Sequence, residues 1–413
     1  MKKIVLLFAA AMMSIGGYCQ KFEGLAQTPQ MGWNSWNTFA TDINEQLIKD
    51  IADAFVTLGL KDAGYEYIVL DDGWMAMERD AQGNLVPHPQ RFPNGIKALA
   101  DYVHSKGLKF GLYNCAGWKT CAGYPGSQGH EYQDALKYAE WGADYLKYDW
   151  CNTAPIKNMP DKESYAKEAY TVMSDALRVA GRPILFSLCE WGDNNPWKWA
   201  APIGHSWRST GDIYHCFDCR KDWGTWQSLG VMQVVNLRNN DTLRRAAGAG
   251  HWNDMDMMEV GNGDLTLYEN QSHFALWAIL NSPLILGNDI RSMSEETRAV
   301  LTNKDIIGVS QDALGIQGFK YKTIDSIEVW AKPLANNEWA LLFLNRAKTP
   351  STLTFDWNAE KIVDDFAQKE LAVSKNNVFK IKDLYANKAL GNTKAPLKAK
   401  LEKHQSLVVR LSK

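Results

Sequence analysis

Short apolar runs alternate with longer amphipathic stretches from the N-terminal region to about residue 308. Four runs have the length and composition of buried strands: residues 67–72, 108–113, 145–149 and 184–188. Between them, apolar residues recur every three or four positions, as on one face of a helix. The first part of the chain is therefore predicted to repeat a strand-then-helix unit.

Two of the intervening helices carry recognisable ends. One is predicted to begin at Asp42, with Glu45 as its capping-box partner three residues on. Another begins near Asp161 and stops at Gly181 and Pro183. The apolar positions at helical spacing are Leu47, Ile51, Phe55 and Leu58 in the first, and Tyr165, Ala169, Val172, Ala176 and Ala180 in the second.

Repeated β-then-α units imply a parallel sheet covered by helices. Their extent suits an eight-fold (β/α)8 TIM barrel over residues 21–310, with a doubly wound open sheet as the rival. Two features favour the barrel. No glycine-rich phosphate loop follows the first strand, and polar residues collect at the ends of many strands and not at one switch point.

The pattern changes to strand-like alternation after Gly308. Ile327, Val329 and Ala331 alternate with polar residues, and Asn336-Asn337 predicts a turn before a second strand at 339–344. No strong helical pattern follows. We predict a small C-terminal antiparallel β-sandwich domain over residues 311–413.

The first 20 residues have the pattern of an export signal. Lys2 and Lys3 precede a short apolar run, 4–13, that cannot span a bilayer. A lipoprotein anchor at Cys19 is the alternative, which the bulky Tyr18 disfavours. The expectation is a secreted or periplasmic protein with a cleaved signal peptide. No later stretch is apolar enough for a membrane helix.

Charge and cysteine content narrow the ligand class. The net charge of −2 provides no basic field for nucleic acid, and a neutral or modestly charged small molecule is the easier partner. The 17 Trp suit a sugar-binding cleft, although most are expected in the core. Cys216 and Cys219 form a lone CxxC without histidines at ligand spacing, so no metal or cofactor is predicted. Oligomeric state is left open.

Three motifs place charged residues at strand ends. In 145–149, Lys147 and Asp149 share one strand face, either as a structural ion pair or as a carboxylate kept ionised for attack. Asp71 and Asp72 end another strand, either in a polar turn or as acceptors for hydroxyl groups. In the third motif Asp212 follows Arg208 by four residues, as a salt bridge or as an acid beside its substrate-positioning group.

Three features of the sequence together indicate glycoside hydrolysis. Carboxylates lie at strand ends, the loops are rich in Trp, and no nucleotide-binding loop is present. That reaction needs two carboxyl groups flanking the bond that breaks, roughly 5 Å apart when the configuration is retained. The motifs then occur in a familiar order: TPQMGWNSWNTF, YIVLDDGW, GLKFGLYNCAGWKTCAGYPGS, WGADYLKYDWC, SLCEWG, HSWRSTGDI and HWNDMDM. The chain resembles the α-galactosidases of glycoside hydrolase family 27, and its CEWG segment followed by NNPWKWA is more similar to the plant enzymes than to the animal lysosomal ones.

The resemblance implies a role for each matching residue. Asp149 is the nucleophile and Asp212 the acid/base. The substrate-binding residues are Asp71 and Asp72 at the C4 and C6 hydroxyls, Lys147 at C3 and C4, Trp36 and Tyr113 as pocket walls, Glu190, Trp191 and Arg208 around C2, and Met257 on the far side. Cys121 and Cys151 form the family's disulfide, whereas Cys189 lacks its animal-type partner because Gly204 stands there. Lys147 is expected to hold the pKa of Asp149 low.

The implied activity is retaining hydrolysis of terminal α-linked galactose from oligosaccharides, polysaccharides or glycoconjugates. The alternatives are β-L-arabinopyranosidase, α-N-acetylgalactosaminidase and a catalytically dead galactose-binding protein. Bulky Glu190-Trp191 leaves no room for an acetamido group at C2, and the retained pair Asp71-Asp72 favours galactose over arabinopyranose. Both reacting acids are present, which disfavours the binding protein.

Overall fold

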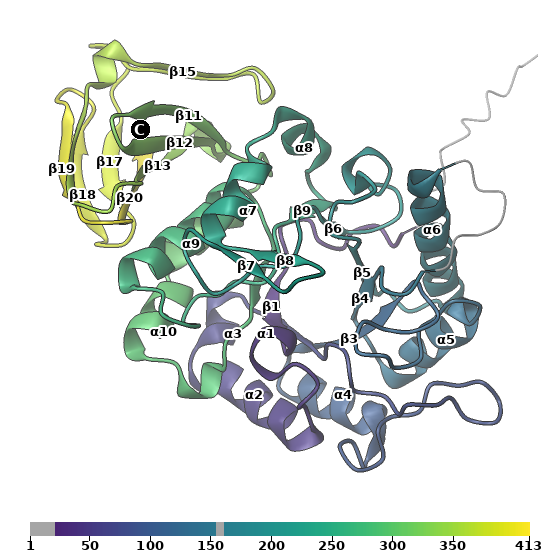
Figure 1. Ribbon diagram of the computed structural model, residues 1–413. Helices are drawn as coiled ribbons and strands as arrows, with labels where there is room; N and C mark the ends of the chain where they lie inside the picture. The colour runs from purple at the N-terminus through teal and green to yellow at the C-terminus, as the bar shows by residue number, and fades with distance from the viewer. Residues whose placement is uncertain (1–20, 154–160) are drawn as a thin grey trace, which may run out of the picture.

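The computed structural model describes residues 21–153 and 161–413, so the predicted signal segment and Cys19 lie outside the described residues. The first part of the chain is a barrel of eight parallel strands in the order β10-β1-β2-β3-β4-β5-β6-β9, with helices around it (Figure 1). The strands are β1 Met31–Asn34, β2 Tyr67–Val69, β3 Lys109–Cys115, β4 Tyr145–Asp149, β5 Leu185–Cys189, β6 Ser206–Arg208, β9 Trp252–Asp254 and β10 Leu284–Leu286.

A parallel bridge beyond β9 closes the ring of strands. Met258 pairs with Leu286, and its N–H donates to the carbonyl of Ile285 at 2.7 Å. The TIM barrel is thereby confirmed, and the open-sheet alternative is wrong. The eight strands are short and bury nearly all of their residues, because helices cover the outside and side chains fill the inside.

The barrel helices differ in length, and the two shortest have four residues each. They are α1 Trp36–Phe39, α2 Glu45–Thr57, α3 Leu60–Ala63, α4 Gly95–Ser105, α5 Glu131–Trp141, α6 Lys162–Ala180, α7 Val231–Arg238, α8 Asp241–Ala246, α9 Leu267–Ile279, α10 Glu295–Leu301 and α11 Lys304–Ser310. The hairpin of β7 (Arg220–Asp222) and β8 (Gln227–Leu229) is inserted between β6 and α7.

Helix α2 begins later than predicted. Its N-cap is Asn44, whose side-chain oxygen accepts from the Leu47 N–H at 2.9 Å, so the predicted start at Asp42 is wrong. Asn44 has the extended backbone that an N-cap requires, and its side chain satisfies a free amide of the first turn. The Glu45 carboxylate binds Asn94 and Lys49 and closes no capping box.

Helix α6 has the predicted ends but a rotated buried face. Asp161 caps it by accepting from the Ser164 N–H, and Gly181 ends it with φ of +79°. Tyr170 and Met173 are fully buried, whereas Val172 and several other members of the predicted apolar stripe are only half-buried. Tyr170 fills the space between the barrel and this helix, and it stacks on Trp150 with ring centroids 5.6 Å apart.

The C-terminal domain is the predicted antiparallel β-sandwich. Its main sheet has the order β11-β12-β13-β20-β17-β18, and shorter pairs β14-β19 and β15-β16 accompany it. The strands are β11 Phe319–Ile324, β12 Ile327–Pro333, β13 Trp339–Asn345, β14 Ser351–Phe355, β15 Lys361–Asp364, β16 Lys369–Ala372, β17 Lys380–Asp383, β18 Lys388–Asn392, β19 Leu397–Leu401 and β20 Ser406–Ser412. Asn336 and Asn337 make the predicted turn, both with positive φ.

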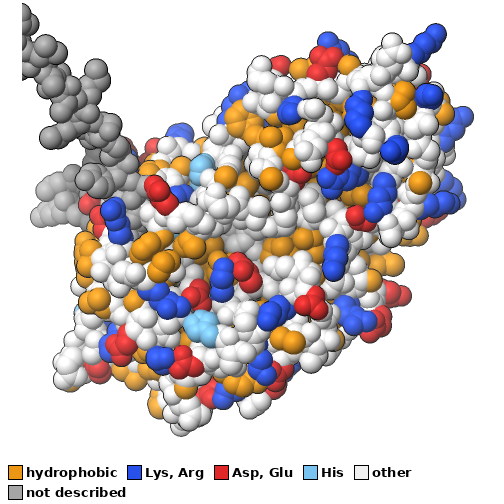
Figure 2. All heavy atoms as spheres, turned by 180° about the vertical axis from the view of Figure 1, so that it is seen from behind, with side chains coloured by type: hydrophobic (Ala, Val, Ile, Leu, Met, Phe, Trp, Pro, Cys, Tyr) orange, Lys and Arg blue, Asp and Glu red, His pale blue; other side chains and the backbone are white. Residues whose placement is uncertain are grey.

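The two domains pack through α9 and α11 of the barrel. Lys332 of β12 is completely buried there and donates to the carbonyls of Ala278 and Val309 and to the side chain of Asn281. Figure 2 shows acidic and basic side chains interspersed over the lower part of the face seen from behind, while basic side chains are more frequent at its upper right. Among the described residues, none of the helices has the length and apolar character to cross a membrane.

Candidate active site

The predicted site residues lie at or just beyond the C-terminal ends of the barrel strands. Because parallel strands of a barrel end at the same rim, residues distant in sequence meet there. Trp36 follows β1, Asp71 and Asp72 follow β2, Tyr113 lies in β3, Lys147 and Asp149 lie in β4, Glu190 and Trp191 follow β5, Arg208 ends β6 with Asp212 just after it, and Met257 follows β9.

Asp149 is a buried carboxylate with two hydrogen-bond donors. The hydroxyl of Tyr113 donates to Oδ2 at 3.0 Å, and the N–H of Trp150 donates to Oδ1 at 2.9 Å. Burial raises the pKa of Asp149 to about 6, against the lowering effect of the Lys147 ammonium, and the charge of Asp212 adds to the increase. The prediction that Lys147 keeps this pKa low is therefore wrong in its net direction, because desolvation outweighs the attraction.

Lys147 pairs with Asp71 and not with Asp149. Its Nζ lies 2.7 Å from Asp71 Oδ2, which also accepts from the amide of Asn34 at 2.7 Å. Burial opposes the charge on Lys147, but the Asp71 carboxylate outweighs it and holds the pKa of Lys147 above its usual value. Sequence reasoning missed Asn34, although it ends β1 within the motif that supplied Trp36.

Asp72 has an oxygen without a partner. Its Oδ2 accepts from the N–H of Ala122 at 2.8 Å, while Oδ1 is buried and has no hydrogen-bond partner among the described residues. Burial raises the pKa of Asp72 to about 7. An unpaired buried acceptor is costly, so a ligand hydroxyl donating to it would gain a strong hydrogen bond.

Arg208 joins two carboxylates at the rim. Its Nη2 lies 3.0 Å from Asp212 Oδ1 and 2.9 Å from Asp256 Oδ2. The Asp212 side chain is 41% exposed, whereas Arg208 and Asp256 are buried. Asp212 can therefore reach a ligand in the opening while the guanidinium fixes its position.

Asp256 is a site residue that sequence reasoning missed. It accepts from the N–H of Ile213 at 2.8 Å in addition to Arg208, and its backbone has a φ of +84°. Burial raises its pKa to about 6. A non-glycine residue in this conformation is held there by its surroundings, which is common at functional sites. The alternating acids of HWNDMDM were the available signal.

The carboxylate of Glu190 forms hydrogen bonds within its own loop. Its two carboxylate oxygens accept from the N–H groups of Gly192 at 2.9 Å and Asn194 at 2.6 Å, and the residue is fully buried. Burial raises its pKa, and the loop amides oppose that increase. Trp191 is half-buried in this loop with a φ of +59°. Glu190 thus stabilises the turn that carries Trp191.

A cavity at the barrel end brings several of these residues together. Its lining includes Lys147, Arg208 and Met257 of the predicted set, together with Asn34, Cys189 and Asp256. Trp36, Tyr113, Asp149, Trp191 and Asp212 are not among its lining residues. The cavity is therefore the inner end of the site, below the carboxylates at the rim.

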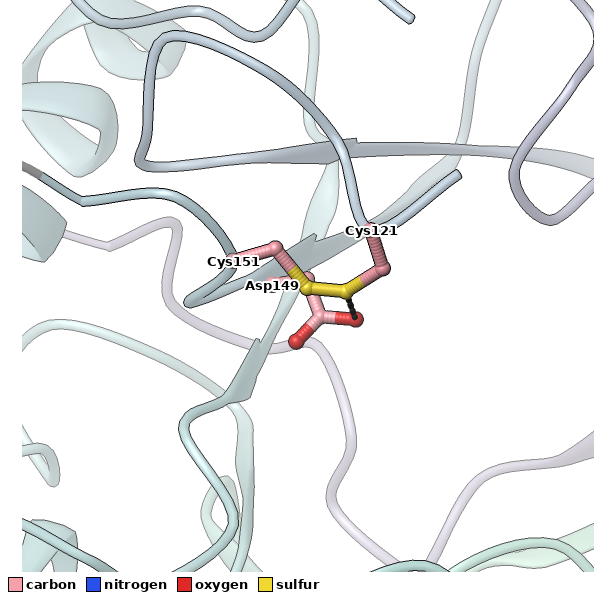
Figure 3. A group of neighbouring side chains, drawn as sticks. All are labelled: Cys121, Asp149 and Cys151. Atoms are coloured by element: carbon pink, nitrogen blue, oxygen red, sulfur yellow. Dashed lines mark hydrogen bonds between the residues drawn. A yellow bond between two sulfur atoms is a disulfide. The ribbon is translucent and has the colours of Figure 1, made fainter. Parts of the chain in front are cut away.

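Two disulfides lie in the loops around the site. The structure pairs Cys121 with Cys151, as the resemblance implies, and Cys121 Sγ lies 3.7 Å from Asp149 Oδ2 (Figure 3). These three side chains are crowded enough for a metal, but sulfurs bonded to each other offer no thiolate ligands. A second bridge joins Cys216 and Cys219. The buried Cys115 and Cys189 carry free thiols.

Both domains match known protein families. Residues 28–312 match the family described as alpha galactosidase A, and residues 324–411 match the alpha galactosidase C-terminal beta sandwich domain. A curated relative, alpha-galactosidase A of Cellvibrio japonicus, is 52% identical over 98% of this chain and 97% of its own length.

Solved structures agree with the sequence comparison. Alpha-galactosidase I from Mortierella vinacea is 35% identical, with a TM-score of 0.85 over 94% of this chain and 98% of that one. The alpha-galactosidase of Saccharomyces cerevisiae, solved with raffinose, is 32% identical, with a TM-score of 0.84 over 94% and 98% of the two chains. The chain therefore belongs to the α-galactosidases of glycoside hydrolase family 27.

Proposed function

We propose that this protein is a retaining α-galactosidase that releases terminal α-linked galactose from oligosaccharides, polysaccharides or glycoconjugates. Family membership and the activity named for its relatives support the reaction class. The observation that carries the mechanism is the contrast between two rim carboxylates. Asp149 is buried and held by two donors, while Asp212 is half-buried and positioned by Arg208.

In the first step, Asp149 attacks the anomeric carbon as the bond to the leaving oxygen breaks. Asp212 donates its proton to that oxygen, and a covalent β-galactosyl enzyme forms. In the second step, Asp212 takes a proton from water, which attacks the same carbon and releases α-galactose. Asp212 has by then given its proton to the leaving oxygen, and its carboxylate therefore serves as the base of the second step.

The remaining polar residues would hold the hydroxyl groups of galactose. The unpaired oxygen of Asp72 and the Lys147–Asp71 pair offer acceptors and a donor at one side of the site. Burial makes these hydrogen bonds strong, since little water competes for them. Trp36, Tyr113 and Met257 would supply the apolar walls against which the ring packs.

The alternatives differ from galactosides at a single ring position. A panel of p-nitrophenyl glycosides, with α-galactoside, α-N-acetylgalactosaminide and β-L-arabinopyranoside, separates them by kcat/KM. We expect α-galactoside to dominate, because Trp191 restricts C2 and Asp71 and Asp72 are both present. Dominance of the arabinopyranoside would contradict the proposed specificity, and no cleavage by folded protein would contradict the proposed activity.

We also propose that residues 1–20 direct export and are removed, which places the mature enzyme in the periplasm or outside the cell. The charged start and short apolar run support this, and the two disulfides suit an oxidising compartment. Mass spectrometry of the protein from its producing cells should give an N-terminus near residue 20. A lipid-modified Cys19 or an intact Met1 would contradict it.

A further inference from the structure

The hairpin β7-β8 carries two exposed tryptophans beside the proposed acid/base. Trp223 and Trp226 are 48% and 49% exposed, although most large aromatic residues of this chain are buried. Their rings stack with centroids 5.6 Å apart and planes 21° apart. We call Trp223 and Trp226 the indole platform. Exposed apolar surface that a fold keeps rigid commonly marks a binding site.

The base of this hairpin is bonded directly to the segment that holds Asp212. The N–H of Leu229, the last residue of β8, donates to the carbonyl of Asp212 at 2.8 Å, and Ile213 forms a parallel bridge with Leu229. Figure 1 draws the hairpin between α7 and the open end of the barrel. Because Asp212 protonates the leaving oxygen, the groups attached to that oxygen leave the site on this side.

The platform is fixed before any ligand arrives. The indole N–H of Trp223 donates to Ser228 Oγ at 3.0 Å, and Tyr214 meets the same ring edge-on with centroids 6.2 Å apart. Lys221 Nζ lies 5.0 Å from the Trp223 centroid. Within the part of the chain that the structure describes, Trp226 has no ring or cation contact other than Trp223. The ring face of the platform that stays open to a ligand is therefore a face of Trp226.

The C-terminal domain braces the start of the hairpin. Between the paired Cys216 and Cys219, Phe217 stacks on His404 with centroids 4.5 Å apart, and Asp218 binds Arg346 at 2.8 Å. Both partners belong to the sandwich domain. A loop held by a disulfide, a ring contact and an ion pair loses little freedom on binding, which favours affinity.

We infer that the indole platform binds a sugar ring of the leaving group, with the apolar C–H face of a pyranose packed on Trp226. The hairpin is close to neutral, with Arg220, Lys221 and Asp222 its only charged residues, which suits an uncharged saccharide. Flat aromatic surfaces are the usual partners of such rings, since they bury C–H groups without competing for hydroxyls. This inference rests on the proposed function and adds a preference for saccharide over small leaving groups.

The test compares two substrates that share galactose and differ in the leaving group. Raffinose releases a disaccharide, whereas α-galactosyl fluoride releases a fluoride ion that has no ring to bind. We expect Trp226→Ala to lower the ratio of kcat/KM on raffinose to kcat/KM on α-galactosyl fluoride by about tenfold or more. Trp226→Phe, which keeps a ring, should restore the ratio to within about threefold of wild type.

Control variants keep the outcomes separate. Tyr132→Ala removes an exposed aromatic residue of α5, 48% exposed, and should leave the ratio unchanged. Trp226→Gln serves as a second variant without a ring if Trp226→Ala folds poorly. If the ratio of kcat/KM on raffinose to kcat/KM on α-galactosyl fluoride is unchanged in a folded variant without the ring, the inference is overturned. The indole platform would then bind something other than the leaving group. Failure of the wild type to hydrolyse α-galactosyl fluoride would overturn the proposed function itself.

Discussion

The largest difference between Asp149 and Asp212 is in their exposure to solvent. Asp149 is 6% exposed and its pKa is raised to about 6, whereas the Asp212 side chain is 41% exposed. The folded protein therefore keeps an ionised carboxylate in a poorly solvated place at neutral pH. Such a carboxylate reacts readily, but it costs the fold stability.

That cost can be measured with Asp149→Asn. The pKa of Asp149 rises from about 3.8 unfolded to about 6 folded, so the ionised form destabilises the fold by about 3 kcal/mol above pH 6. Below about pH 3 both states are largely protonated, and the penalty disappears. We expect Asp149→Asn to unfold at a higher temperature than wild type at pH 7, with the difference shrinking by pH 4.

Calorimetry at the two pH values checks this expectation, with the exposed Asp101→Asn as the control that should change little at either pH. A stabilisation of Asp149→Asn that grows toward acid pH would contradict the argument, because it would mean that the folded state lowers this pKa.

The same substitution tests the chemical role. Asn cannot attack the anomeric carbon, so kcat on p-nitrophenyl α-galactoside should fall by at least about 10³-fold. Far-ultraviolet circular dichroism should remain that of the wild type. Near-wild-type turnover of the folded variant would rule out Asp149 as the nucleophile.

Residue identities were readable from the sequence only where a motif carried them. The motifs supplied Asp149 at the end of β4, Asp212 just beyond β6 and Lys147 within β4. They did not show that Lys147 would pair with Asp71 or that Arg208 would bridge to Asp256, because those contacts join different strands. Burial decided the sign of the pKa shift at Asp149, and the depth of a side chain is a property of the packed fold.

At the scale of elements, glycine positions show how closely the site loops are packed. A Cβ on Gly117 would lie 2.0 Å from the carbonyl oxygen of Cys151, two residues beyond Asp149. Gly117→Ala must displace that backbone, so we expect kcat/KM to fall by at least about tenfold.

Gly308 in α11 has nothing within 4 Å of the position that a Cβ would take, and Gly308→Ala should stabilise the protein by about 0.5–1 kcal/mol.

Steady-state kinetics and thermal unfolding of the two variants give the comparison. Wild-type kcat/KM in Gly117→Ala would show that the loop can yield without moving Asp149. Loss of stability in Gly308→Ala would show that this position is crowded.

Element boundaries were predictable where side chains cap them and less so elsewhere. Asp161 and Gly181 set the ends of α6 as expected, because each satisfies a requirement of the helix terminus itself. The start of α2 was predicted two residues too early, at Asp42, whereas Asn44 is the cap; both residue types suit that role. Which of them adopts the extended cap conformation depends on the preceding loop.

At the scale of the whole molecule, the barrel and the sandwich are joined by buried polar contacts. Lys332 donates from the sandwich to three acceptors of the barrel, and Arg244 of α8 pairs with Asp364 of β15. The sequence predicted both domains from their periodicity, since strands alternate every two residues and helices every three or four. The sequence could not predict the interface, because its contacts join isolated polar residues of one domain to residues of the other that are distant in sequence.

Lys332→Met tests the strength of that interface. Met keeps most of the volume but leaves three buried acceptors without their donor, so the free energy of unfolding should fall by about 2–4 kcal/mol. Denaturant titration provides the measurement, and the exposed Lys388→Met should lie within about 0.5 kcal/mol of wild type. Unchanged stability of Lys332→Met would mean that the two domains are held together by other contacts.

The central claim is that Asp149 and Asp212 hydrolyse α-galactosides by two displacements. The most direct test is to follow the hydrolysis of p-nitrophenyl α-galactoside by proton NMR and to identify the anomer that appears before mutarotation. Double displacement predicts α-galactose as the first product, with the β anomer growing in later. If β-galactose appears first, a single displacement by water has occurred, and Asp149 is not a nucleophile.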